Sequence, residues 1–179
     1  FWSLRMKHDA AAHQLPEWED LRQHASDIKR HTLSHLVDYL EKFTSQLESR
    51  GVIVHWASDA AEFNAIVYDI LKSHDVKKMV KSKSMLTEEC EMNPYLIERG
   101  IDVVESDLGE RILQLLGQRP SHIVMPAIHL TRQEVGKMFE EKGISHEIGN
   151  YDPTYLTQCA RYSLRNEFIE AEAGMTGCN

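Results

Sequence analysis

The sequence is poor in cysteine: its 179 residues include Cys90, Cys159 and Cys178, and they form no Cys-x-x-Cys pair. An iron–sulfur cluster usually needs four thiolate ligands, so we expect this chain alone to hold no cluster. Few and widely spaced cysteines also argue against a disulfide-stabilised scaffold and favour a reducing compartment. We therefore expect the protein to be cytoplasmic.

Long apolar runs are absent as well. No run approaches the roughly 20 residues that cross a membrane, so we predict no membrane span. The first twenty residues lack the apolar stretch of a signal peptide. The net charge of −8 argues against binding to nucleic acid or to anionic membranes. Apolar residues nevertheless make up 42% of the chain, which is enough to form a core.

The N-terminal part of the sequence has a helical pattern. Over residues 16–50, apolar side chains recur at steps of three and four, which is typical of an amphipathic helix. Pro16 suits the first turn of this helix, and Gly51 suits the position after its last turn. With a short helix or arm over residues 1–14, we expect an N-terminal helical extension over residues 1–50 that docks on a core.

After this extension, short apolar segments alternate with longer helical patterns. The capping pairs Asp59–Glu62 and Thr131–Glu134 mark two helix starts, and no further element is expected after residue 172. This alternation is the signature of βαβ units, so we predict an α/β fold in which helices flank a mostly parallel sheet. The predicted strands are residues 52–57, 77–84, 101–107 and 122–127. The predicted helices are residues 60–75, 87–100, 108–117, 132–143 and 153–172.

Lysine and serine alternate over Lys81–Ser84, at the end of the second predicted strand and before a helix. Open parallel sheets bind ligands beyond the carboxyl ends of their strands. Ammonium, hydroxyl and helix N–H groups favour an anion there, such as a carboxylate or a phosphate. Because alternate strand residues share a face, we expect Lys81 and Lys83 on one face and Ser82 and Ser84 on the other. The alternative is that the lysines are exposed and the serines cap the next helix.

Polar side chains also follow two other predicted strands. Glu105, Asp107 and Glu110 follow the third strand, and His129 follows the fourth. A histidine near lysines and carboxylates is a candidate general base for removing a hydroxyl proton. Two plainer alternatives stay open: Asp107 is the N-cap of a helix, and His129 is a loop residue.

A metal site is not predicted. His31 and His35 have the i, i+4 spacing of two zinc ligands on a helix. Thr32 stands where the glutamate of a His-Glu-x-x-His motif belongs, and no other histidine pair has suitable spacing.

Over residues 15–179 the chain resembles the lactate-utilisation iron–sulfur proteins. The motifs VKSKSMLTEE, VVESDLGERILQL, SHIVMPAIH and GMTGCN occur in the order found in that family. The resemblance implies a fold similar to the sugar-phosphate isomerase and CoA-transferase type. It also implies that residues 51–179 are a lactate-utilisation domain that is incomplete at its C-terminus. The matched motifs include the candidate substrate-binding residues Lys81, Ser82, Lys83, Ser84, Glu88, Glu105, Asp107 and Glu110, and the candidate base His129.

Members of that family work with partner proteins to oxidise L-lactate to pyruvate, and they pass the electrons through iron–sulfur clusters. The resemblance implies that these clusters belong to a C-terminal ferredoxin-like domain missing here, so this fragment is expected to hold no cofactor and to be inactive by itself. We expect the lysine–serine cluster to hold the carboxylate of lactate or pyruvate, with other subunits of a lactate-utilisation complex as partners. One alternative is a non-catalytic interaction domain that docks partner subunits. Another, resting on fold analogy alone, is a transferase or isomerase for a phosphorylated or CoA-linked substrate.

Overall fold

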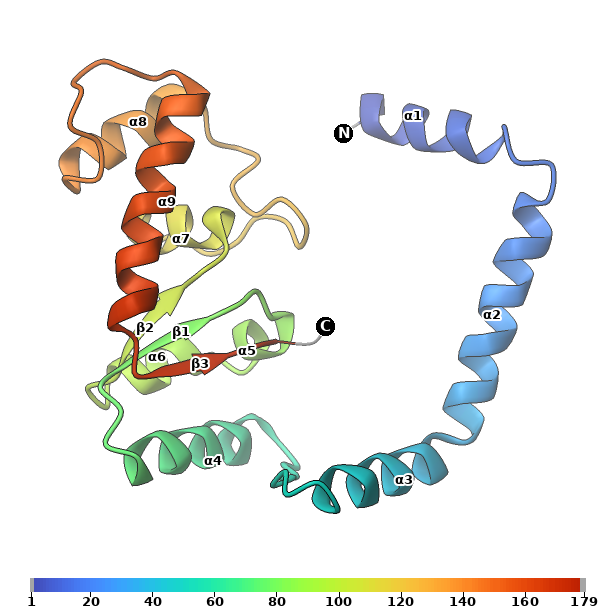
Figure 1. Ribbon diagram of the computed structural model, residues 1–179. Coiled ribbons are helices and arrows are strands. Elements are labelled where there is room, and N and C mark those ends of the chain that lie inside the picture. The colour runs from blue at the N-terminus through green and yellow to red at the C-terminus, as the bar shows by residue number, and fades with distance from the viewer. Residues whose placement is uncertain (1, 178–179) are drawn as a thin grey trace. The chain divides into compact units, whose positions relative to one another are not determined.

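The computed structural model describes residues 2–177, so Cys178 and Asn179 of the terminal motif lie outside the described residues. The chain divides into two compact units, Phe1–His55 and Trp56–Asn179, each of which is described by itself (Figure 1).

The first unit consists of the helices α1 (Trp2–Ala12), α2 (Trp18–Ser34) and α3 (Leu36–Glu48). The prediction of one continuous helix over residues 16–50 is wrong, because the chain leaves the helical conformation at His35, where φ is −121°. The His35 ring stacks on the His31 ring at 4.4 Å between centroids, and its Nδ1 atom lies 2.9 Å from the His31 carbonyl oxygen. Neither α2 nor α3 contains a buried residue.

The second unit contains a parallel sheet of β1 (Lys78–Lys81), β2 (Asp102–Glu105) and β3 (Ala173–Met175) in the order β2-β1-β3. Val80 of β1 pairs with Val104 of β2 and with Gly174 of β3. Helices flank this sheet (Figure 1), so the predicted α/β class with a parallel sheet is confirmed. The flanking helices are α4 (Ala60–Ser73), α5 (Met85–Glu89), α6 (Met92–Ile97), α7 (Leu108–Leu116), α8 (Arg132–Glu141) and α9 (Pro153–Glu170).

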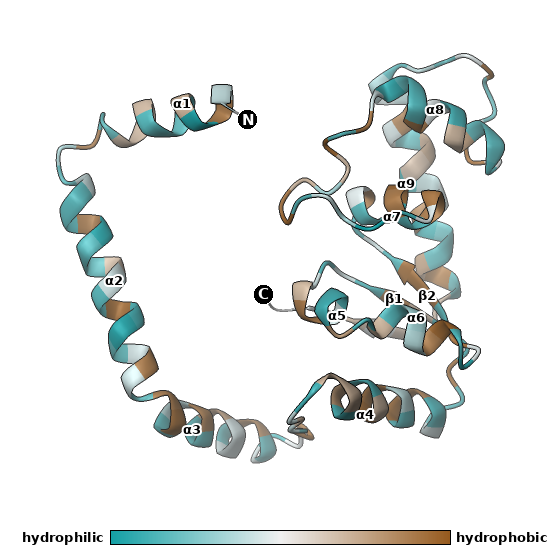
Figure 2. Cartoon of the chain, turned by 180° about the vertical axis from the view of Figure 1, so that it is seen from behind, coloured by the Kyte–Doolittle hydropathy of each residue, from teal (hydrophilic) through white to brown (hydrophobic). Residues whose placement is uncertain are grey.

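Alternation along the strands divides the core between two sides of the sheet. Met79 and Val103 point to one side, where they pack with α4 and α6, while Lys78 points to the other side and contacts α9. Figure 2 shows apolar residues gathered on α4 and α6. The core on that side consists of Leu71, Val76, Met79, Met92, Leu96, Ile101 and Val103. A second core joins α7, α8 and α9 through Ile112, Met138, Phe139, Leu156 and Ala160.

Two predicted strands, residues 52–57 and 122–127, do not form, whereas β3 forms where no element was expected. β3 takes the place beside β1. At the outer edge of β2, the Gln114 side chain accepts from the Glu105 N–H at 3.1 Å and donates to the Val103 carbonyl at 2.6 Å. Since Gln114 uses the backbone groups that another strand would need, residues 122–127 have no edge to join there.

The predicted capping pairs are confirmed in part. Thr131 and Glu134 form a reciprocal capping box at α8. Asp59 accepts from the Glu62 N–H as predicted, but the Glu62 carboxylate bonds to Ser58 instead of reaching back to Asp59. No helix within residues 2–177 is long and apolar enough to cross a membrane.

Candidate functional site

The inner part of the candidate site is a buried ion pair between two strand ends. Lys81 is the last residue of β1, Glu105 is the last residue of β2, and the parallel register places them side by side. Their charged atoms, Lys81 Nζ and Glu105 Oε1, lie 2.7 Å apart, and the Lys81 side chain is only 1% exposed. The alternative in which the lysines are exposed is therefore wrong for Lys81.

Further polar groups surround this ion pair. Lys81 Nζ donates to Thr87 Oγ1 at 3.0 Å and lies 3.6 Å from Glu88 Oε1. Asn93 donates from Nδ2 to Glu105 Oε1 at 2.6 Å. Because the Lys81 side chain is 1% exposed and its ammonium already contacts Glu105 and Thr87 at 3.0 Å or less, it is not open to a ligand. Lys81 instead ties the ends of β1 and β2 to α5.

The outer part of the site forms around Lys83, whose side chain is 24% exposed. Lys83 Nζ lies 3.1 Å from Glu110 Oε1 and 3.8 Å from Asp107 Oδ1, and it donates to the Val124 carbonyl at 3.3 Å. Asp107 also accepts from the Gly109 N–H at 3.1 Å, which confirms its predicted role as the N-cap of α7. Since β1 ends at Lys81, the strand alternation does not extend to Lys83, and the two lysines meet different carboxylates.

The carboxyl groups of the outer part titrate differently. Burial is the largest cause that raises the pKa of Glu110 to about 7; a hydrogen bond with Asp107 contributes to the rise, and Lys83 opposes it. The same hydrogen bond lowers the pKa of Asp107, and the Lys83 charge lowers it as well. Glu110 therefore exchanges a proton near neutral pH, while Asp107 stays ionised.

Three buried oxygens of the site have no hydrogen-bond partner within the described residues: Glu105 Oε2, Glu110 Oε2 and Asn93 Oδ1. A buried acceptor without a donor costs about 1–3 kcal/mol. Each of these atoms can accept a hydrogen bond, so a donor group placed beside it would offset this cost.

The structure brings six of the predicted site residues into two groups of three, and neither group is a cation-rich pocket. Two ammonium groups meet four carboxyl groups, so the lysines are neutralised by the protein itself. The six residues are Lys81, Lys83, Glu88, Glu105, Asp107 and Glu110.

The other predicted site residues have different contacts. Ser84 is the N-cap of α5, as the plainer interpretation of the motif expected. Ser82 Oγ accepts from the Gly177 N–H at 2.9 Å. His129 is exposed, with Nδ1 2.9 Å from Ser121 Oγ and Nε2 3.2 Å from Gln118 Oε1. Among the described residues, His129 does not contact the lysines or carboxylates of the site.

Metal ligands do not gather in the described part of the chain. Within residues 2–177, no group of three or more His, Cys, Asp or Glu side chains is arranged to hold a metal ion. The described cysteines, Cys90 and Cys159, are both free thiols. These residues do not fit an iron–sulfur cluster, which needs about four thiolates.

A groove of about 780 Å³ beside α9 was not predicted from the sequence. Arg161, Arg165 and Ser106 are among its lining residues. The sequence did carry one signal for this groove. Arg161 and Arg165 are four positions apart, and no acidic residue lies three or four positions from either of them on the helix.

The match to known proteins covers the whole α/β unit and begins before it. Residues 40–179 match the family model of the LUD domain. Curated relatives named Lactate utilization protein B include those of Exiguobacterium sp., 45% identical over 94% of this chain, Bacillus pumilus, 43% over 95%, and Oceanobacillus iheyensis, 44% over 94%. The aligned parts cover 36%, 36% and 35% of these relatives, so the chain spans about a third of their length. No solved structure matches the chain.

Proposed function

The chain belongs to the LUD-domain family, and from that premise we propose that it serves L-lactate utilisation as part of a protein that oxidises lactate to pyruvate. The observation that carries the proposal is the identity of 43–45% with proteins named Lactate utilization protein B over nearly the whole chain. The proposal includes partner subunits and a cytoplasmic location, the latter from the cysteine content.

Lactate carries a carboxylate and a hydroxyl group, and the outer part of the site offers a partner for each. We propose that Lys83 faces the carboxylate and that Glu110 accepts the hydroxyl proton. The two side chains are 3.1 Å apart, and Glu110 Oε2 is buried with no hydrogen-bond partner among the described residues. A carboxyl group whose pKa is about 7 is well suited to act as a general base at neutral pH.

Glu110 becomes neutral when it accepts the hydroxyl proton, and this changes how the site holds an anion. When Glu110 is neutral, Lys83 faces only the charge of Asp107, which is 3.8 Å away. The carboxylate of the product, pyruvate, then meets an ammonium that is less compensated by the protein. Lys81 is not assigned this role because it is buried and its ammonium already contacts Glu105 and Thr87.

The electrons of this oxidation need an acceptor other than ordinary side chains. Since the cysteines of this chain do not fit an iron–sulfur cluster, no electron-transfer step is assigned to its residues. The proposed acceptor lies outside residues 2–177. His129 is not proposed as the base, because both of its ring nitrogens already have partners.

A second candidate function is a domain that docks partner subunits without catalysis. Apolar side chains on α2 and α3 favour it, because Leu33, Val37 and Phe43 are 69%, 67% and 55% exposed. In that case the helices bind a partner subunit, and the lysine–carboxylate pairs only hold the sheet ends together.

Growth on L-lactate distinguishes these two functions. Cells whose only copy of the protein carries Lys83→Ala or Glu110→Gln are expected to consume L-lactate at least about tenfold more slowly, with unchanged growth on glucose. Lys142→Ala is the matched control, because Lys142 is an exposed lysine at the end of α8. If both site variants accumulate normally and consume lactate at the wild-type rate, the docking function is supported and the substrate site is wrong.

A further inference from the structure

The groove on α9 lies on the opposite side of the sheet from the buried Lys81–Glu105 pair. One lining residue is Ser106, which directly follows β2 and shares the sheet face of Val104. Ligands of open α/β sheets bind at this carboxyl end of the strands. The remaining lining residues come from α9: Gln158, Arg161, Tyr162, Leu164, Arg165, Phe168 and Ile169.

Two arginines of this groove have no counter-charge. Arg161 and Arg165 lie one turn apart on the exposed side of α9, and neither forms a hydrogen bond or ion pair with a described residue. Elsewhere in the unit, Arg111 and Arg119 each pair with a glutamate at 2.7 and 2.6 Å. This contrast occurs in a chain with 28 acidic and 20 basic residues. Like charges at i, i+4 weaken a helix slightly, and a bound anion removes that repulsion.

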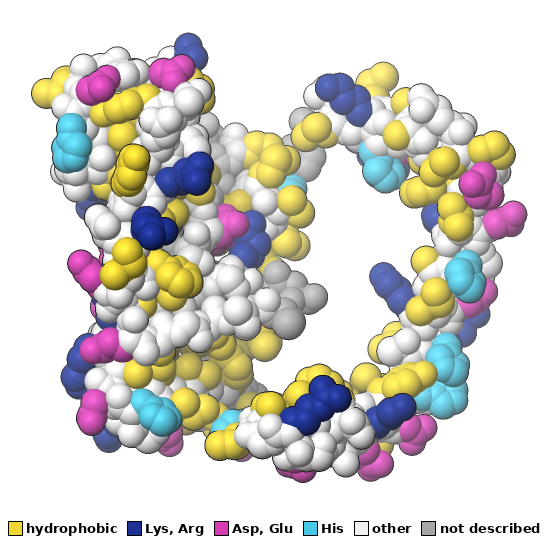
Figure 3. All heavy atoms as spheres, in the orientation of Figure 1, with side chains coloured by type: hydrophobic (Ala, Val, Ile, Leu, Met, Phe, Trp, Pro, Cys, Tyr) yellow, Lys and Arg dark blue, Asp and Glu magenta, His cyan; other side chains and the backbone are white. Residues whose placement is uncertain are grey.

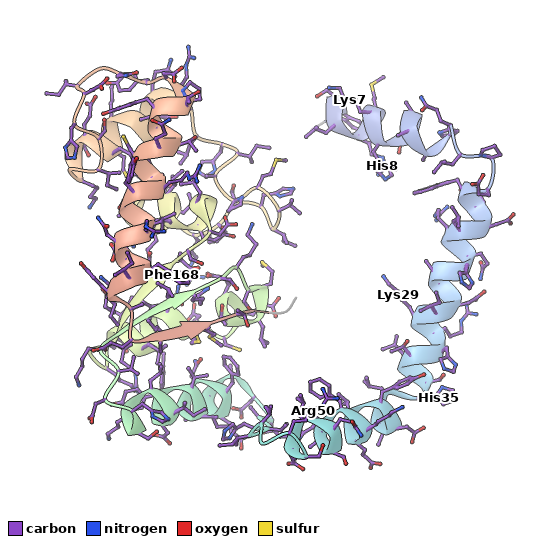
Figure 4. All side chains as sticks on the ribbon, viewed as in Figure 1. Lys7, His8, Lys29, His35, Arg50 and Phe168 are labelled. Carbon is purple, nitrogen blue, oxygen red and sulfur yellow. The ribbon has the colours of Figure 1, made fainter. Side chains whose placement is uncertain are left out.

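Apolar side chains lie beside the arginines. Tyr162, Phe168 and Ile169 are 72%, 63% and 68% exposed. Figure 3 shows cationic side chains next to apolar ones over α9, and Figure 4 shows Phe168 at the end of α9 that approaches the sheet. Aromatic rings and guanidinium planes offer flat surfaces on which another ring can stack.

The volume and the chemistry of the groove together define a ligand class. Its volume of about 780 Å³ lies within the range of roughly 300–1,000 Å³ that is usual for small-molecule sites. Guanidinium groups bind carboxylate or phosphate in a bidentate manner. We propose that the α9 groove binds an organic anion in which a phosphate or carboxylate group is joined to a flat apolar ring.

This site is separate from the proposed lactate site. Lactate has no ring, and none of the groove's lining residues takes part in the lysine–carboxylate pairs. The inference therefore does not depend on the proposed function, and either can fail without the other.

Calorimetric titration of the full chain tests the groove with two probes. Adenosine monophosphate presents a phosphate with a ring, and 2-naphthoate presents a carboxylate with a ring. At least one of them is expected to bind with a Kd below about 1 mM, and Arg161→Ala or Arg165→Ala is expected to raise that Kd at least about tenfold. Binding of only one probe identifies phosphate or carboxylate as the anion.

Arg132→Ala is the matched control, because Arg132 is an exposed helical arginine that forms no ion pair with a described residue. Circular dichroism verifies that each variant keeps its helix content. The proposal is overturned if neither probe binds below about 1 mM, or if both groove variants bind like the wild type. It is also overturned if inorganic phosphate or adenosine alone binds as tightly as adenosine monophosphate, since the groove then does not recognise a joined anion and ring.

Discussion

The ion pair between Lys81 and Glu105 gives a direct prediction about stability. Lys81→Met keeps most of the side-chain volume but removes the ammonium, and Glu105, only 3% exposed, then keeps Asn93 as its remaining side-chain donor. Breaking a buried ion pair by removing one partner costs about 3–5 kcal/mol, because a charge stays buried without compensation. Against a usual total stability of about 5–15 kcal/mol, Lys81→Met is expected to remove a large share of the free energy of unfolding.

Urea unfolding measures this cost, and a double variant isolates its cause. Lys81→Met combined with Glu105→Leu removes both charges, so it is expected to be at least about 2 kcal/mol more stable than the sum of the two single changes predicts. Lys142→Met, which changes an exposed lysine, is expected to cost under about 0.5 kcal/mol. A Lys81→Met cost below about 1 kcal/mol, or additive single and double variants, would refute the argument that this pair holds the sheet ends together.

Two further predictions concern Glu110 and Gln114. The pKa of Glu110 is raised from 4.5 to about 7, mainly by burial. Between these two pH values the native state keeps a proton that the unfolded chain has lost. The free energy of unfolding therefore falls by about 1–2 kcal/mol as the pH rises from 4.5 to about 7. Glu110→Gln removes this fall, and urea unfolding at pH 5 and pH 8 checks it; an unchanged difference contradicts the assignment. Gln114→Ala leaves the Glu105 N–H and the Val103 carbonyl at the edge of β2 without partners, so we expect a loss of about 1–3 kcal/mol and self-association through the freed edge. Urea unfolding and sedimentation measure both effects, and Gln158→Ala, on the exposed side of α9, is the control that should change neither.

Hydrophobic periodicity and capping chemistry predicted the local elements that depend on near neighbours in the chain. The helix starts at Asp107 and Thr131 are examples, because each cap bonds to a backbone N–H two or three residues away. The strands β1 and β2 were also predicted, since each has a short apolar centre and lies between helical patterns.

The errors lie where a distant residue decides the outcome. Residues 122–127 have the composition of a strand, but the Gln114 side chain occupies the hydrogen-bonding groups at the edge of β2. No local sequence pattern indicates that contact. β3 has three residues, too few for a period-two pattern, and it forms because β1 offers a free edge. Strand formation depends on an available neighbour, so sequence periodicity alone does not fix it.

The candidate site shows the same division. The polar residues at the ends of the predicted strands led us to expect that lysines and carboxylates would meet, and six of the predicted residues do so. The partners Thr87 and Asn93 were missed, because α5 and α6 are short helices whose orientation depends on packing.

The two lysines of Lys81–Ser84 therefore have different surroundings, which depend on where β1 ends. Lys81 is still in the strand, so the register holds it against Glu105 and burial makes it structural. Lys83 comes two residues later, where the chain has left the sheet, and it reaches the start of α7 while remaining 24% exposed. A change at Lys81 is therefore expected to lower stability, whereas a change at Lys83 is expected to lower lactate consumption with little loss of stability, because a partly exposed ion pair is worth about 1 kcal/mol or less. If Lys83→Ala instead costs as much stability as Lys81→Met, both lysines are structural and the proposed substrate site loses its cation.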